Sequence, residues 1–167
     1  MSYINPSPGN AAEQVVVKVK ISGVGNGTAN ITSVPAIQNL TINNATDVFS
    51  WSQLDSASKL QIPTTATNGL DTTIVVDHDT FFGTNGNITG STLPTMGLMG
   101  VSKAKSLVQF SIRASAATGN AVFISGSGYV TNLAPTVSAD QPVWTTPMTI
   151  AVTGDYTVGE TEAAGFD

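Results

Sequence analysis

One stretch of alternating residues constrains the fold of this chain more than any other feature. The segment VSKAKSLVQFSIRAS spans 101–115, and its apolar face carries Ala104, Val108, Phe110 and Ile112. Its other face carries Lys103, Lys105, Gln109 and Arg113. A period of two is typical of a β-strand with one buried face. The turn ATGN (117–120) and the run AVFISGSGYVTNL (121–133) follow, so the sequence predicts a β-hairpin over 101–130.

Four further segments have the same β-forming character. They are QVVVKVKIS (14–22), ITSVPAIQNLTI (31–42, bent or at a sheet edge because of Pro35), DTTIVVDHDTFF (71–82) and MTIAVTGDYTV (148–158). The residues between 134 and 144 are predicted as a connection. Five or six strands of this kind indicate a protein that is built around β-sheet.

Two segments have another character. NATDVFSWSQLDSASKL (44–60) is predicted as a short helix that Asp47 or Ser50 would cap, with a loop as the alternative. GTNGNITGSTLPTMGLMG (83–100) is predicted as a long loop. Loops of this length in compact domains usually have a function. Its apolar residues Leu93, Met96, Leu98 and Met99 favour packing under a neighbouring chain.

Length and pattern together predict a single domain over residues 1–167. It comprises an N-terminal arm (1–13), a β core (14–158) that contains the extended loop, and a C-terminal tail (159–167). The predicted fold class is mainly β: a β-sandwich or squashed barrel of mixed short strands, with at most one short helix, a long middle loop and terminal arms.

The chain carries few charges. Charged residues make up 10% of the sequence, against about 25% in a typical domain. Such a surface favours contact with further copies of the chain. The net charge of −5 argues against binding nucleic acid through its phosphates, and no lysine or arginine follows Arg113.

The absence of cysteine excludes disulfides and thiolate metal sites. No apolar run is long enough for a membrane span.

The sequence SGSGY contains Gly126 and Gly128 and raises the question of a phosphate-binding loop. Such a loop lies between a strand and the N-terminus of a helix. Here β-forming residues lie on both sides, and no lysine is near. We therefore interpret the glycines as a bulge or as a close approach of two backbones.

Asp77, His78 and Asp79 form the other local group that suggests chemistry. In a strand, the two carboxylates would lie on one face and the imidazole on the other, so the three could not bind one metal ion. A solvated strand end is the main interpretation. A weak cation site at Asp77 and Asp79, or a pH-sensitive contact between subunits, is the alternative.

No catalytic, cofactor-binding or metal-binding residue is assigned, and the chain is predicted not to be an enzyme. The aromatic residues Trp51, Trp144, Tyr129 and Tyr156 could form a sugar-binding platform, although their spacing favours core and interface packing. Asn-X-Ser/Thr sequences occur at Asn26, Asn30, Asn39, Asn44 and Asn87. The first residues do not resemble a secretion signal, so these sequences are interpreted as chance.

Three stretches carry a resemblance to a known family. TTIVVDHDTFFG, GLMGVSKAKSLVQFSIR and FISGSGYVTNLAPTVSADQPVWTTPMTIAVTGDYTV, within residues 71–158, resemble the major tail tube proteins of long-tailed bacteriophages. The resemblance lies in strand order, the SGSGY turn and the closing W…MTIAVTGDY hairpin.

The resemblance implies a β-sandwich-like domain flanked by a helix, without enzymatic residues. It implies homo-oligomeric hexameric rings, stacked into a hollow tube through which double-stranded DNA passes without specific binding. Other tail proteins would be partners, and the middle loop and terminal arms would contact neighbouring rings. The chain would be made in the host bacterial cytoplasm and end in the virion tail.

Two alternatives stay open: a capsid decoration or other virion ring protein, and a carbohydrate-binding β-sandwich module. For a tube, the acidic balance predicts that acidic side chains line the bore. Lys103, Lys105 and Arg113 would then lie at subunit contacts or outside.

Overall fold

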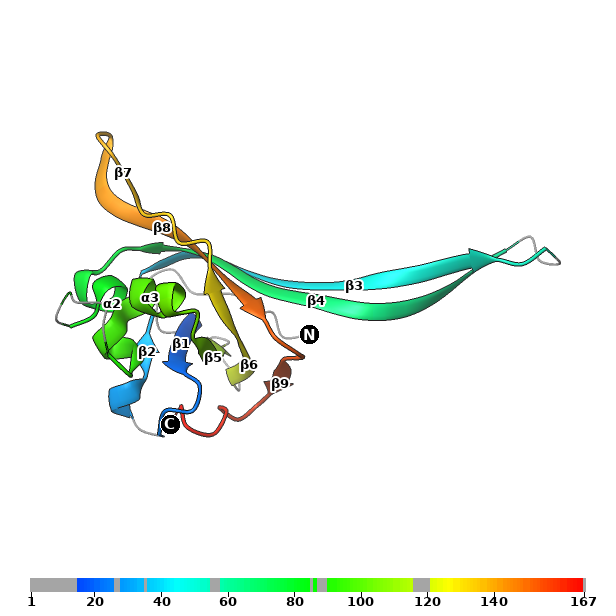
Figure 1. Cartoon of the computed structure of the whole chain (residues 1–167), viewed down its shortest axis with the longest axis horizontal. Coiled ribbons are helices and arrows are strands. Elements are labelled where there is room, and N and C mark those ends of the chain that lie inside the picture. Colours follow the sequence, from blue (N-terminus) through cyan, green and yellow to red (C-terminus); the bar gives the residue numbers. More distant parts are fainter. Residues whose placement is uncertain are drawn as a thin grey trace.

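The fold is one open antiparallel sheet with helices on one face (Figure 1). A computed structural model describes residues 15–25, 28–34, 36–54, 58–84, 86, 90–115 and 121–166. The predicted N-terminal arm, the ATGN turn and the middle of the 83–90 segment lie outside these ranges. The mainly β class that the sequence predicts is confirmed.

The elements follow one another in a simple order. The strands are β1 Val15–Ile21, β2 Thr32–Ser33, β3 Ile37–Ser52, β4 Lys59–Val75, β5 Leu107–Ser115, β6 Ala121–Thr131, β7 Thr136–Ser138, β8 Gln141–Val152 and β9 Thr157–Gly159. The helices are the 3-10 turn η1 Thr28–Asn30, α2 His78–Phe82 and α3 Leu93–Ala104. The predicted hairpin exists as β5 and β6, which pair from Leu107↔Tyr129 to Ser115↔Ala121. The strand prediction over 101–115 is wrong before Leu107, because residues 101–104 belong to α3.

The described strands form a single nine-stranded sheet. Its order is β2-β1-β5-β6-β8-β4-β3, with β7 paired to β8 and β9 paired to β6. The predicted strand at 148–158 is two strands, because β8 ends at Val152 and β9 begins at Thr157. The predicted connection at 134–144 contains β7 and the start of β8. Within the described ranges the second layer over the core is therefore helical.

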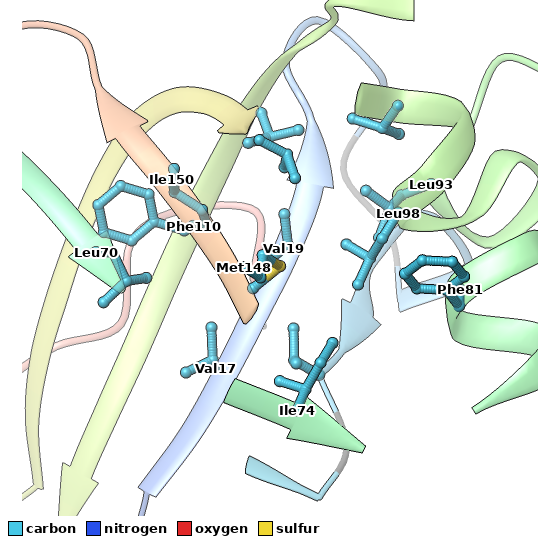
Figure 2. Close-up of a cluster of buried hydrophobic side chains, with 14 of the residues drawn as sticks. Val17, Val19, Leu70, Ile74, Phe81, Leu93, Leu98, Phe110, Met148 and Ile150 are labelled. Atoms are coloured by element: carbon cyan, nitrogen blue, oxygen red, sulfur yellow. The ribbon is translucent and has the colours of Figure 1, made fainter. Parts of the chain in front are cut away.

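Alternation along the strands decides which face is buried. Val17 and Val19 on β1 lie opposite Ile112 and Phe110 on β5, and all four are at most 2% exposed. The helices supply Phe81, Leu93 and Leu98 to the same cluster. Figure 2 shows these helical side chains facing the sheet residues Val19, Ile74 and Met148. Burial of each such side chain contributes roughly 1.5–3 kcal/mol.

Helix α2 lies where the sequence predicts the end of a strand. The carboxylate of Asp77 accepts hydrogen bonds from the backbone nitrogen and the hydroxyl of Thr80, both at 3.1 Å, and so caps the helix. An N-cap aspartate satisfies backbone donors that would otherwise lack partners. The strand prediction over 71–82 is therefore wrong beyond Val75.

Helix α3 replaces the second part of the predicted long loop, from Leu93 onward. Thr92 and Thr95 form a capping box, and Pro94 lies in the first turn, where its missing N–H costs nothing. The helix breaks at Gly97 and ends at Lys105, whose φ is 52°. Leu93 and Leu98 are fully buried in the core of their own chain. The loop prediction for 83–100 is thus wrong from Leu93 onward, and so is the limit of one short helix.

The helix predicted over 44–60 is also wrong. Residues 37–52 and 59–75 form a long antiparallel hairpin, with pairing from Ile37↔Ile74 to Ser52↔Lys59. Cross-strand pairing satisfies the backbone of these Thr- and Asn-rich strands, which have little tendency to form helix.

Gly97 lets the two helices approach closely. Its φ is 65°, and a Cβ atom would fall against the carbonyl oxygen of Phe81 and the backbone nitrogen of Gly83. We expect Gly97→Ala to lower the free energy of unfolding by at least about 1–3 kcal/mol, because it adds a clash and backbone strain. Urea denaturation followed by circular dichroism measures the change.

Gly25→Ala is the matched control for this prediction. No atom lies within 4 Å of the position that its Cβ would take. A Gly97→Ala chain as stable as this control would contradict the expected clash.

Candidate assembly surface

The outer part of the β3–β4 hairpin extends far from the body of the chain (Figure 1). We call residues 44–54 and 58–68 the hairpin arm. Strand β4 pairs with β8 only over Gly69–Val75, so within the described residues the strands of the arm pair only with each other. A two-stranded ribbon without a further layer is marginally stable in water. The arm therefore needs a partner surface for a stable structure.

One face of the arm is apolar. Phe49 lies opposite Ile62, and Trp51 lies opposite Leu60, so the four side chains share a face. Phe49 is 60% exposed and Ile62 is 51% exposed. The rings of Phe49 and Trp51 stack with centroids 5.8 Å apart. We call these four residues the aromatic face; contiguous exposed apolar residues of this kind mark interaction sites.

A bulge fixes the middle of the arm. The register shifts between Thr46 and Val48, where Asp47 lies opposite two threonines. The hydroxyl of Thr64 donates to the carbonyl of Asp47 at 3.1 Å, and that of Thr65 donates to its carboxylate at 3.3 Å. Bulges increase local twist and set the direction of the strands beyond them. The bulge thus orients the aromatic face relative to the body.

Strand β3 is also an edge of the sheet. In the described part of the chain, it pairs only with β4. An edge strand carries backbone donors and acceptors that can pair with another chain. At sixteen residues, this edge is far longer than the usual strand of about five or six.

A second hairpin projects from the body (Figure 1). It consists of β7 and the start of β8, which pair at Thr136↔Thr145 and Ser138↔Gln141. Val137, Val143 and Trp144 on this hairpin are each about half exposed. The chain therefore presents apolar side chains on two separate projections.

The SGSGY glycines serve packing in the sheet. A Cβ on Gly128 would fall against the carbonyl oxygen of Ala151, and one on Gly126 would lie 3.0 Å from the ring of Phe110. Both residues lie within β6, and the next elements are β-strands. The interpretation as a close backbone approach is confirmed.

Asp77, His78 and Asp79 lie at the start of α2 rather than in a strand. Asp77 is engaged as the helix cap, and His78 Nδ1 lies 3.0 Å from a carboxylate oxygen of Asp79. The side chains of His78 and Asp79 are about 70% exposed. Among the residues that the structure describes, no group of three or more potential metal ligands occurs.

The other candidate residues are dispersed. Trp51 lies on the arm, Tyr129 on β6 and Trp144 on β8, so the structure does not gather them into one platform. Lys103 and Lys105 lie at the end of α3.

The Asn-X-Ser/Thr sequences lie in different settings. The side-chain oxygen of Asn39 accepts a hydrogen bond from the backbone nitrogen of Thr73 at 2.8 Å, whereas Asn26 and Asn87 lie outside the described residues. The described helices are not long and apolar enough to cross a lipid bilayer.

The aromatic face is the main feature that sequence reasoning missed. Its signal was present, because Phe49 and Trp51 are two residues apart and so are Leu60 and Ile62. The polar segment between these pairs is a turn signal. Two such pairs flanking a turn predict a hairpin with one apolar face.

No protein-family model and no curated protein matches this sequence. Solved structures do match its fold. A chain from the tail of an empty gene transfer agent particle, with C6 symmetry, has a TM-score of 0.57 and 9% identity, over 88% of this chain and 96% of that one. A chain from the baseplate of the anti-feeding prophage has a TM-score of 0.57 and 8% identity, over 87% and 92%.

A third solved structure also matches the fold of this chain. It is a chain from the sheath-tube complex of the PVC extracellular contractile injection system, with a TM-score of 0.52 and 12% identity over 89% of each chain. The chain thus has a fold found in phage-tail-like particles. The resemblance to phage tail tube proteins is confirmed at the level of the fold.

Proposed function

We propose that this chain is a non-enzymatic structural subunit of a phage-type tail. Copies of it assemble into rings of six, and the rings stack into a hollow tube through which double-stranded DNA is delivered. The observation that carries the proposal is the fold match over 88% of the chain to a tail with C6 symmetry. The chain would be made in the host bacterial cytoplasm and end in the virion tail, in contact with other tail proteins.

The exposed surfaces support this proposal. A ring forms when one patch of a subunit contacts a different patch of the next, and the rotation closes. The long β3 edge suits pairing within a ring. The arm extends well beyond the body and carries the aromatic face. It suits contact with a subunit of an adjacent ring.

The charge of the chain suits the inner wall of such a tube. With a net charge of −5, the assembled surface would repel nucleic acid over about one Debye length, roughly 8–10 Å. We propose that acidic side chains line the bore, and that Lys103, Lys105 and Arg113 lie at subunit contacts or outside. A reconstruction of the assembly with a basic bore would contradict this assignment.

Negative-stain electron microscopy of the untagged protein over a concentration series tests the proposal. We expect rings or hollow tubes of uniform width, with six-fold symmetry in end views. Dispersed monomers or trimers at every concentration would favour a capsid decoration protein. Saturable binding on a glycan array, lost in Trp51→Ala or Trp144→Ala, would favour a carbohydrate-binding module.

A further inference from the structure

Three cationic side chains share the face of the sheet that lies opposite the core. Lys18 pairs with Ser111, and Val16 pairs with Arg113. Side chains alternate between the two faces along a strand, and Val17, Val19 and Ile112 face the core. Their neighbours Lys18, Lys20 and Arg113 therefore face the other way. Diagonal neighbours on an antiparallel pair lie about 7–8 Å apart. We call these residues the cationic face; it holds three of the six lysines and arginines of the chain.

The C-terminal segment Glu160–Phe166 lies against this face. The Lys18 ammonium is 2.9 Å from one carboxylate oxygen of Glu162 and donates to the other at 3.0 Å. It also donates to the backbone carbonyl of Phe166 at 2.8 Å. These contacts join residues 144 and 148 positions apart in the sequence. The segment that was predicted as a free tail is therefore bound to the sheet at Lys18.

Lys20 is held by the same segment. Its ammonium donates to the carbonyl of Gly165 at 3.1 Å and lies 4.9 Å from the centroid of the Phe166 ring. Lys20 is 3% exposed and Phe166 is 2% exposed. An ammonium over an aromatic ring is attracted by the ring quadrupole, and more strongly when it is desolvated. The segment thus removes the charge of Lys20 from the solvent.

A pocket of about 230 Å³ opens beside the segment. Its lining includes Gln109, Ser125 and Ser127 of the sheet, Asp155, and Ala163, Ala164 and Phe166 of the segment. The lysine contacts and the buried ring of Phe166 hold the segment on the sheet. Beyond Arg113 the chain carries acidic residues and no basic ones. The segment therefore brings the carboxylate of Glu162 onto the cationic face.

We infer that Glu160–Phe166 is a built-in cover that prevents the cationic face from binding nucleic acid. Lysine and arginine side chains on one face bind phosphates by releasing counterions. With the segment in place, Arg113 is the exposed member of the trio. The benefit of this arrangement rests on the proposed function, because the subunits of a conduit for DNA should not hold nucleic acid on any surface. The cover itself is tested on dispersed chains.

The experiment compares the whole chain with a chain that lacks residues 161–167. Fluorescence anisotropy of a labelled short duplex DNA is measured at low salt, below the concentration at which the chain assembles. We expect the shortened chain to bind at least about ten-fold more tightly than the whole chain. Its binding should weaken with salt, with a slope of log K against log salt of about −2 to −3, as for two or three phosphate contacts.

The matched control is the shortened chain with Lys18→Ser and Lys20→Ser, which should lose the added binding. Circular dichroism checks that each chain is folded. Should the deletion unfold the protein, Glu162→Gln with Phe166→Ser in the whole chain makes the same comparison. If the whole chain and the shortened or substituted chain are both folded and bind DNA equally, the inference is overturned. Failure to form tubes in the microscope would instead contradict the proposed function.

Discussion

Replacing Phe49, Trp51 and Ile62 with serine is expected to abolish assembly of the chain while the body stays folded. These side chains form most of the aromatic face, and none belongs to the buried core cluster. Each substitution removes roughly 1–2 kcal/mol of the free energy of contact with a partner subunit. Full burial of a large apolar side chain contributes about 1.5–3 kcal/mol, and these side chains are already partly buried in the single chain. The critical concentration for assembly should therefore rise at least about 100-fold. Sedimentation and negative-stain microscopy measure it.

The control for this prediction lies on the opposite face of the same arm. Ser50 pairs with Gln61 there, and Ser50→Thr with Gln61→Thr keeps the strands polar and β-forming. This variant should assemble as the unmodified chain does. If the serine variant formed tubes at the unmodified concentration, the aromatic face would not be an assembly contact.

Phe81→Ala is expected to lower the free energy of unfolding by about 3–5 kcal/mol, as for other fully buried phenylalanines. Phe81 is 1% exposed and packs edge-to-face on Phe82, with ring centroids 4.9 Å apart. It joins α2 to the core (Figure 2). Its backbone carbonyl lies against Gly97 of α3, so a cavity there would weaken both helices. Urea denaturation monitored by far-ultraviolet circular dichroism measures the loss.

Phe49→Ala is the matched control, because it removes the same side chain from a position that is 60% exposed. Its effect on the stability of the dispersed chain should stay within about 0.5 kcal/mol. Similar losses from the two variants would contradict the assignment of Phe81 to the core and of Phe49 to an uncovered surface.

The sequence predicts those strands that pack one face on the core, because their apolar and polar residues alternate. In β1, Val17 and Val19 alternate with Lys18 and Lys20, and in β5, Phe110 and Ile112 alternate with Ser111 and Arg113. Val17, Val19, Phe110 and Ile112 are buried in the core, as this alternation predicts. Lys20 and Ser111 on the other face are buried as well, Lys20 beneath the C-terminal segment, which the alternation does not predict. Period-two patterns survive in the structure because a one-residue slip would bring every polar side chain into the core.

The sequence fails where tertiary context decides. The arm is exposed on both faces, so no alternation of burial distinguishes its strands from a helix. Helix α3 is broken at Gly97, and its glycines, proline and threonines are individually typical of loops. It is helical because its apolar side chains pack on the sheet and because Thr92 caps it.

The low charge of the sequence predicts contact between copies of the chain, without locating the exposed apolar surfaces. The sequence assigns contacts with neighbouring rings to the middle loop and the terminal arms, and that assignment stays a prediction. The structure exposes apolar residues on the hairpin arm, at Phe49 and Ile62, and on the β7–β8 hairpin, at Val137 and Val143. The pairing that gathers these side chains is local, since Phe49 lies opposite Ile62 and Thr136 lies opposite Thr145, so the sequence carries the signal for both hairpins.

The contact between Lys18 and Glu162 also orders events during synthesis. A ribosome releases β1 well before the segment that binds it, because Lys18 and Glu162 lie 144 positions apart. Contacts of such wide separation form late in folding, because a long loop must close before they are made. A nascent chain therefore exposes its N-terminal lysines until translation has passed Phe166. The cationic face is thus covered only after the segment Glu160–Phe166 has been translated.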